Sequence, residues 1–104
     1  MDRAIAMYWK VIALNPSYSN AYNNLGNVYA RLGRFSEAVE QYKLAIRLDP
    51  ANAAIYHNLA STYNQQGKKA EAEAVMEQVR WLTGKGKGLR EGDWELPEMH
   101  HPHR

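Results

Sequence analysis

Apolar and aromatic residues recur three or four positions apart along most of the chain. Tyr22, Leu25 and Tyr29 have this spacing, which places their side chains along one face of a helix because an α-helix turns once every 3.6 residues. The same pattern returns further along the chain, and a comparable one precedes it. The pattern predicts five helices, near residues 2–14, 20–32, 36–48, 54–66 and 69–83.

Glycine and proline mark the ends of the predicted helices. Gly33 and Gly67 stand where a helix must stop and reverse, and glycine tolerates the left-handed backbone that such a stop usually needs. Asn15-Pro16 ends the predicted helix 2–14, and Asp49-Pro50 ends the predicted helix 36–48. Proline cannot continue a helix and restricts the residue before it. The helices are therefore expected to form antiparallel pairs.

The chain contains an internal repeat, since residues Ser19 to Asn52 realign on Ala53 to Gly86 at a spacing of 34. A fixed period of this length is typical of stacked helical units. The identical pairs are Tyr22/Tyr56, Asn24/Asn58, Leu25/Leu59, Tyr29/Tyr63, Gly33/Gly67, Glu37/Glu71, Ala38/Ala72 and Leu48/Leu82.

The residues at fixed places in the two copies resemble the tetratricopeptide-repeat (TPR) family. The first copy has Tyr22, Leu25, Gly26, Tyr29, Ala38, Tyr42, Ala45 and Pro50 at the signature places of that family. The second has Tyr56, Leu59, Ala60, Tyr63, Ala72, Met76 and Val79, then Gly84 where proline is usual. Its weaker end is typical of a terminal repeat. Counting back from Pro16 puts Ala4, Tyr8 and Val11 at the places of a second helix.

The resemblance implies an all-α fold, a right-handed helix-turn-helix solenoid of about two and a half repeats with an irregular C-terminal tail. Residues 1–84 would form the solenoid, divided into a half repeat at 1–18, a full repeat at 19–52 and a terminal repeat at 53–84. Residues 85–104 would form a Gly/Lys hinge and a tail with tryptophan and histidine. Small residues at Gly26, Ala38, Ala60 and Ala72 are expected where helices approach within about 8 to 10 Å.

The resemblance also implies that the first helix of each pair lines a concave face where extended peptides bind. The residues predicted for peptide binding are Asn20, Asn23, Asn24, Asn27, His57, Asn58 and Ser61. Asn24 and Asn58 share a repeat position and can both donate to and accept from a bound strand. They are similar to the asparagine ladder in the superhelix of O-linked N-acetylglucosamine transferase, with only two rungs and no catalytic portion. The alternative is a solvated polar face.

A carboxylate clamp, as in chaperone-binding members of the family, is a further alternative for this face. Asn27 and Asn58 would supply its asparagines. Asn23 stands where the first lysine is expected, however, and no third inner helix supplies the other cations, so capture of a charged chain end would be weak.

A rival hypothesis makes the chain a structural subunit of an assembly or a homo-oligomer. The half repeat lacks its first helix, so a neighbouring chain would cover its apolar side, because exposed apolar patches of this extent usually mark an interface. The predicted contacts are Ile5, Tyr8, Trp9 and Ile12 in the N-terminal helix and Trp94, Leu96 and Met99 in the tail.

His100, His101 and His103 form the one cluster in the sequence with metal-ligand chemistry. A metal site needs fixed geometry and supporting hydrogen bonds, which a chain end rarely supplies. We therefore expect a solvated, pH-sensitive terminus, with neither a metal nor a cofactor.

Composition and charge narrow the function classes. The net charge of +2 comes from 13 basic and 11 acidic residues scattered along 104 positions, which does not indicate nucleic-acid binding. No segment approaches the about 20 apolar residues of a membrane span. The absence of cysteine is consistent with a reducing compartment, so a cytoplasmic location is expected.

No catalytic residues are predicted, because no nucleophile is accompanied by a base in a pocket. The carboxylates that stand out lie on the second helix of each pair, where charge pairing and solvation explain them: Glu37, Glu40, Glu71, Glu73 and Glu77. The leading hypothesis is a non-catalytic protein–protein interaction module that binds an extended peptide or a partner subunit on its concave face.

Overall fold

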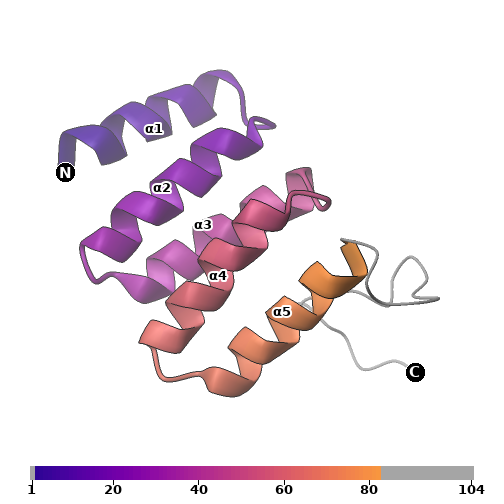
Figure 1. Ribbon diagram of the computed structural model, residues 1–104. Coiled ribbons are helices and arrows are strands. Elements are labelled where there is room, and N and C mark those ends of the chain that lie inside the picture. Colours follow the sequence, from indigo (N-terminus) through magenta and orange to yellow (C-terminus); the bar gives the residue numbers. More distant parts are fainter. Residues whose placement is uncertain (1, 83–104) are drawn as a thin grey trace, which may run out of the picture.

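Five α-helices make up residues 2–82, the part of the chain that the structure, a computed structural model, describes (Figure 1). They are α1 (Asp2–Leu14), α2 (Ser19–Arg31), α3 (Phe35–Leu48), α4 (Ala53–Gln65) and α5 (Lys69–Leu82). Each begins and ends within one residue of the range predicted from periodicity. The all-α fold is confirmed, with no strand in the described part of the chain.

Glycine ends the first helix of each pair, as predicted. Gly33 and Gly67 have φ angles of 78° and 77°, in the left-handed region. The amide of Arg34 then donates to the carbonyl of Tyr29 at 2.9 Å, and the amide of Lys68 donates to that of Tyr63 at 2.8 Å. These bonds satisfy carbonyls at the helix ends, so both repeats reverse direction by the same turn.

The helices stack in chain order. Each packs on its neighbours in sequence, and α2 also contacts α4, so the first helices of the two repeats meet. Figure 1 shows α1 at one end of the array and α5 at the other. The arrangement confirms a helical solenoid and puts α2 and α4 on a common side.

Small residues let the paired helices approach closely. A Cβ atom added at Gly26 would lie 2.6 Å from Cε1 of Tyr42, so α2 can lie this close to α3 only without a side chain there. Ala38 and Ala45 are also completely buried between helices. Around them the large apolar residues form one continuous core, which includes Leu25, Tyr42, Ile46, Ile55, Tyr56, Leu59, Tyr63 and Val75.

Tyrosine hydroxyls tie the loops between repeats to the helices. The hydroxyl of Tyr22 donates to the carbonyl of Pro16 at 3.0 Å, and that of Tyr56 donates to the carbonyl of Pro50 at 2.8 Å. Burial, assisted by the nearby charge of Asp49, raises the pKa of Tyr56 to about 12. The hydroxyl of Tyr56 therefore stays protonated and remains a donor at neutral pH.

The predictions for the C-terminal tail lie outside the described residues. They concern the hinge, the contacts Trp94, Leu96 and Met99, and the histidines His100, His101 and His103. Between residues 2 and 82 no helix is long and apolar enough to span a bilayer. The same residues contain no group of three or more side chains suited to hold a metal ion. The repeat boundaries given above stay predictions.

Candidate binding face

The predicted peptide-binding residues lie on α2 and α4, the two first helices that contact each other. None of them is buried in the core. Asn20, His57 and Ser61 are exposed, whereas the other four asparagines are partly buried: Asn23, Asn24, Asn27 and Asn58. The partly buried amides are therefore the ones whose hydrogen bonds the fold can control.

Asn23 and Asn58 are joined to each other. The side-chain nitrogen of Asn58 donates to Oδ1 of Asn23 at 3.0 Å, which links α2 to α4. An asparagine side chain has two N–H donors and two acceptor lone pairs, so this bond uses one donor of Asn58 and one lone pair of Asn23. Both amides keep part of their capacity for a bound molecule.

The side chain of Asn27 is bonded to a tyrosine of the core. The hydroxyl of Tyr42 donates to Oδ1 of Asn27 at 2.6 Å. Burial raises the pKa of Tyr42, and a hydrogen bond with Thr62 opposes part of that rise, so the hydroxyl remains a donor. This bond uses one lone pair of the Asn27 oxygen, so Asn27 keeps its NH₂ group and a second lone pair for any further partner.

Asn24 differs from Asn58, although the two share a repeat position. Among the described residues its side chain makes no hydrogen bond, while that of Asn58 is bonded to Asn23. The repeat alignment does not reveal this difference, because the bond joins residues 35 apart, one more than the repeat length. A search for polar residues offset by one place between successive first helices would have found it.

The structure gives little support to a carboxylate clamp. Asn27 and Asn58, its two candidate asparagines, are both engaged in bonds within the chain. Asn23, which stands where a lysine is expected, has no charge and accepts from Asn58. The site is therefore polar and neutral at this position, and a terminal carboxylate would find no charge-assisted bond there.

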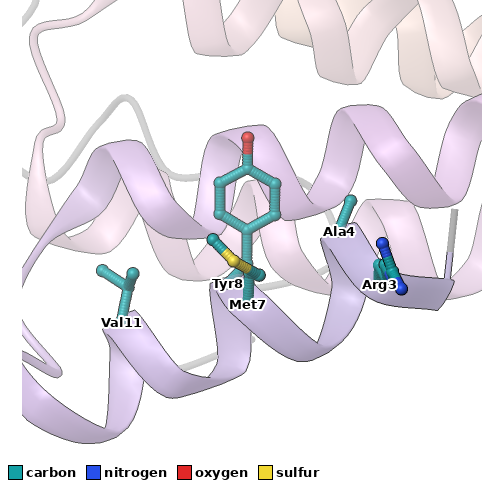
Figure 2. Close-up of a pocket in the computed structure, with 5 residues that line it drawn as sticks. All are labelled: Arg3, Ala4, Met7, Tyr8 and Val11. Carbon is teal, nitrogen blue, oxygen red and sulfur yellow. The ribbon is translucent and has the colours of Figure 1, made fainter.

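A second surface lies on α1. A groove of about 420 Å³ is lined by Arg3, Ala4, Met7, Tyr8 and Val11, which follow one another along this helix (Figure 2). Its lining is apolar apart from the Arg3 guanidinium and the Tyr8 hydroxyl. No other described element contributes a lining residue.

The predicted contact residues of α1 divide between two sides of the helix. Ile12 is expected among exposed contacts, but only 7% of it is exposed, because α1 packs on α2 through this side. Ile5 and Tyr8 are partly buried against the same core, and Trp9 is 41% exposed. Ile12 is therefore removed from the candidate interface, and Met7 is added because it is exposed.

Two carboxylates of the second helices, Glu37 and Glu77, form surface ion pairs. Glu37 is bonded to Arg34 at 2.7 Å, and this hydrogen bond lowers the pKa of its carboxyl. Glu77 is bonded to Arg80, one turn further along α5. Both ion pairs are exposed to solvent, so each contributes little to stability. In the described part of the chain, neither carboxylate has a nucleophilic side chain beside it in a pocket.

Three family profiles match the chain. A profile described as a TPR repeat matches residues 26–67. Two described as a tetratricopeptide repeat match residues 7–40 and 55–91, so that the three together span most of the chain. The chain belongs to the tetratricopeptide-repeat family.

Solved structures of MamA share this TPR fold. One structure of MamA from AMB-1 is 32% identical over 78% of this chain and 48% of its own, with a TM-score of 0.72. A second AMB-1 structure is 30% identical over 82% and 50% of the two chains, with a TM-score of 0.75. MamA from MSR-1 is 32% identical over 79% and 47%, with a TM-score of 0.74. The chain thus spans about half the length of these structures. No curated protein sequence matches it.

The family and the fold make this TPR chain a protein-interaction module. The fold is of a kind that is typically not catalytic, and it places α2 and α4, the helices that carry the asparagines, together on one side.

Proposed function

We propose that this TPR module binds an extended segment of another protein along the face formed by α2 and α4. The observation that carries the proposal is Asn24, a partly buried amide without a hydrogen bond in the described part of the chain. No polar atom of the Asn24 side chain is buried without a partner, so its amide meets solvent and can bond an incoming peptide in place of water.

The chemistry of the face favours a peptide backbone over charged side chains. Asn24 offers both a donor and an acceptor, and Asn58 retains one N–H and its oxygen after bonding Asn23. Asn27 adds an NH₂ group whose orientation is set by Tyr42. Amides of this kind match the alternating N–H and C=O groups of an extended strand without reading its side chains.

The test uses displayed random peptides of about 12 residues, selected on the full chain and then measured by fluorescence anisotropy. Asn24→Ala is expected to weaken binding of the selected peptides by about 3- to 10-fold, the loss of one or two hydrogen bonds. Its circular dichroism and melting curve should be unchanged, because Asn24 makes no internal bond. Asn15→Ala, in the loop after α1, is the matched control and should bind like the original chain.

The Asn58→Ala variant is a second test of whether peptides bind the face formed by α2 and α4. It should weaken peptide binding and also lower stability, since it leaves the oxygen of Asn23 without its donor. If the selected peptides bind Asn24→Ala and Asn58→Ala with unaltered affinity, the asparagine face is not the binding site.

A further inference from the structure

Helix α1 carries one half of a helix-pair interface. Its residues Ala4, Tyr8 and Val11 occupy the same repeat positions as Ala38, Tyr42 and Ala45 of α3, 34 places later. Helix α3 packs on both α2 and α4, whereas α1 packs on α2 alone among the described elements. What α1 lacks is a helix in the place that α2 occupies beside α3.

Exposure at equivalent positions shows the size of this difference. Met7 is 64% exposed, whereas its counterparts Gln41 in α3 and Val75 in α5 are 8% and 0% exposed. Tyr8 is partly exposed, whereas its counterpart Tyr42 is 2% exposed. The groove of Figure 2 is therefore the surface that α2 covers on α3 and that α4 covers on α5.

The covered copies of this surface indicate what would fit the open one. In the first full repeat, Gly26 of α2 lies directly on the ring of Tyr42. In the second, Ala60 takes the glycine position and Met76 takes the tyrosine position. Because α1 has Tyr8 there, its groove requires glycine on the opposing helix, as in α2. The large residues that flank this glycine in α2 are Tyr22, Leu25 and Tyr29.

Charge indicates how such a helix ends. Arg3 stands at the position of Glu37, whose partner Arg34 lies three residues before it at the start of α3, so that ion pair is local to α3. Arg3 itself is exposed and lines the groove near the N-terminal end of α1, so an acidic residue placed there would complement its charge. An antiparallel helix would also bring its C-terminal end, which carries partial negative charge, to this end of α1.

We propose that the α1 groove is the docking site of an antiparallel α-helix from outside residues 1–104, with the pattern Tyr-x-x-Leu-Gly-x-x-Tyr and an acidic residue just after its end. The helix completes the half repeat, with its glycine on Tyr8 and its acid beside Arg3. This inference does not depend on peptide binding by α2 and α4.

The test uses the full chain and a peptide with the sequence of residues 19–34 carrying Arg34→Glu. Binding is followed by NMR of the labelled chain, and saturable shifts are expected at Ala4, Met7, Tyr8 and Val11. Met7→Glu in the chain, and Gly26→Leu in the peptide, should each weaken binding by at least about tenfold, because both obstruct the central contact. A peptide that keeps Arg34 should bind a few-fold more weakly, with a difference that shrinks as salt is added.

Ala6→Glu is the matched control for Met7→Glu. Ala6 is exposed on the same helix, and its counterpart in α3 is the exposed Glu40, so a glutamate at this position is compatible with a covered groove. The Ala6→Glu variant should bind the peptide as the original chain does. If Ala6→Glu and Met7→Glu lose binding equally, the effect is one of charge and the groove is not the site.

Isolated helices of this length are only marginally stable in water, so the free peptide could fail to bind for that reason alone. A fusion of the peptide to the chain removes this difficulty. Residues 19–34 with Arg34→Glu are placed directly before Met1, which reproduces the register in which Arg34 precedes Phe35. Protection of the Met7 amide against hydrogen exchange should rise at least about tenfold, and Gly26→Leu in the added helix should abolish the gain.

Three further outcomes would overturn the proposal. One is a fusion that leaves Met7 exchange unchanged. Another is sedimentation showing that the free chain is already a dimer with α1 protected, which would make a second copy the occupant. The last is a monomer in which the amide of Met7 is already as protected as that of Gln41, which would make the tail the occupant.

Discussion

At the scale of single residues, the contact between Gly26 and Tyr42 determines how closely α2 and α3 approach. The ring of Tyr42 fills the space where a side chain at position 26 would stand, and Tyr42 has 2% of its surface exposed, so it has little room to move. The second repeat has Ala60 and Met76 at these positions. A larger residue on one helix is thus accompanied by a slimmer and more flexible one on the other.

This pairing predicts that Gly26→Ala is strongly destabilising but can be rescued. The added methyl group would clash with the buried ring, so we expect a loss of about 1 to 3 kcal/mol in urea unfolding. Tyr42→Met alone should also destabilise, because it removes the bond to Asn27 and leaves space beside Gly26. The double variant reproduces the second repeat and should lose less than the sum of the two. Strict additivity would mean that the two positions do not share one contact.

At the scale of helices, the two repeats differ in how their first helix begins. Asn52, before α4, accepts the amide of Ala54 at 3.1 Å through its side chain. Tyr18, before α2, has nearly the same backbone, with φ −85° and ψ 97° against −87° and 98°, but makes no capping bond. The backbone is therefore already shaped for a cap that the residue at position 18 cannot provide.

We predict that Tyr18→Asn stabilises the chain by about 0.5 to 1 kcal/mol, because asparagine is among the strongest N-cap residues. Tyr18 is 45% exposed, so part of its ring packing is lost, and the alanine control below accounts for that loss. The free energy of unfolding in urea measures the effect, and Tyr18→Ala is the control, which removes the same ring without adding an acceptor. If the asparagine variant is no more stable than the alanine variant, α2 does not gain a cap at this position.

The helices could be predicted from the sequence because their signals are local. Apolar spacing, Gly33 and Pro50 each act within a few residues, and they place every helix to within one residue of its observed end. The bond between Asn23 and Asn58 could not be predicted, because it depends on how far α2 and α4 are offset along the stack. The placement of Ile12 failed because α1 is apolar around much of its circumference, so its pattern does not show which residues face α2. The repeat does show it, since the counterpart of Ile12 is the buried Ile46.

At the scale of the molecule, contacts form almost entirely between consecutive helices. Apart from the contact of α2 with α4, no described helix touches one that is not its neighbour in the chain. In such an array stability is approximately a sum of the units and their interfaces, so the ends can open while the middle stays folded. Helix α1 has one neighbour and α3 has two.

Ile12 and Ile46 test this arrangement, because they occupy equivalent positions in an end helix and a central helix. Both side chains are buried, at 7% and 1% exposure, so truncation to alanine removes a similar apolar contact from each. Ile46→Ala should lower the free energy of global unfolding by about 2 to 4 kcal/mol and reduce the protection of amides throughout α2–α5. Ile12→Ala should instead detach α1 locally, because among the described helices only α2 packs on α1, and this change weakens that interface. Hydrogen exchange followed residue by residue should then show faster exchange in α1 and nearly unchanged exchange in α4 and α5. Equal loss of protection in all five helices for both variants would show that the chain unfolds as a single unit and that α1 is part of it.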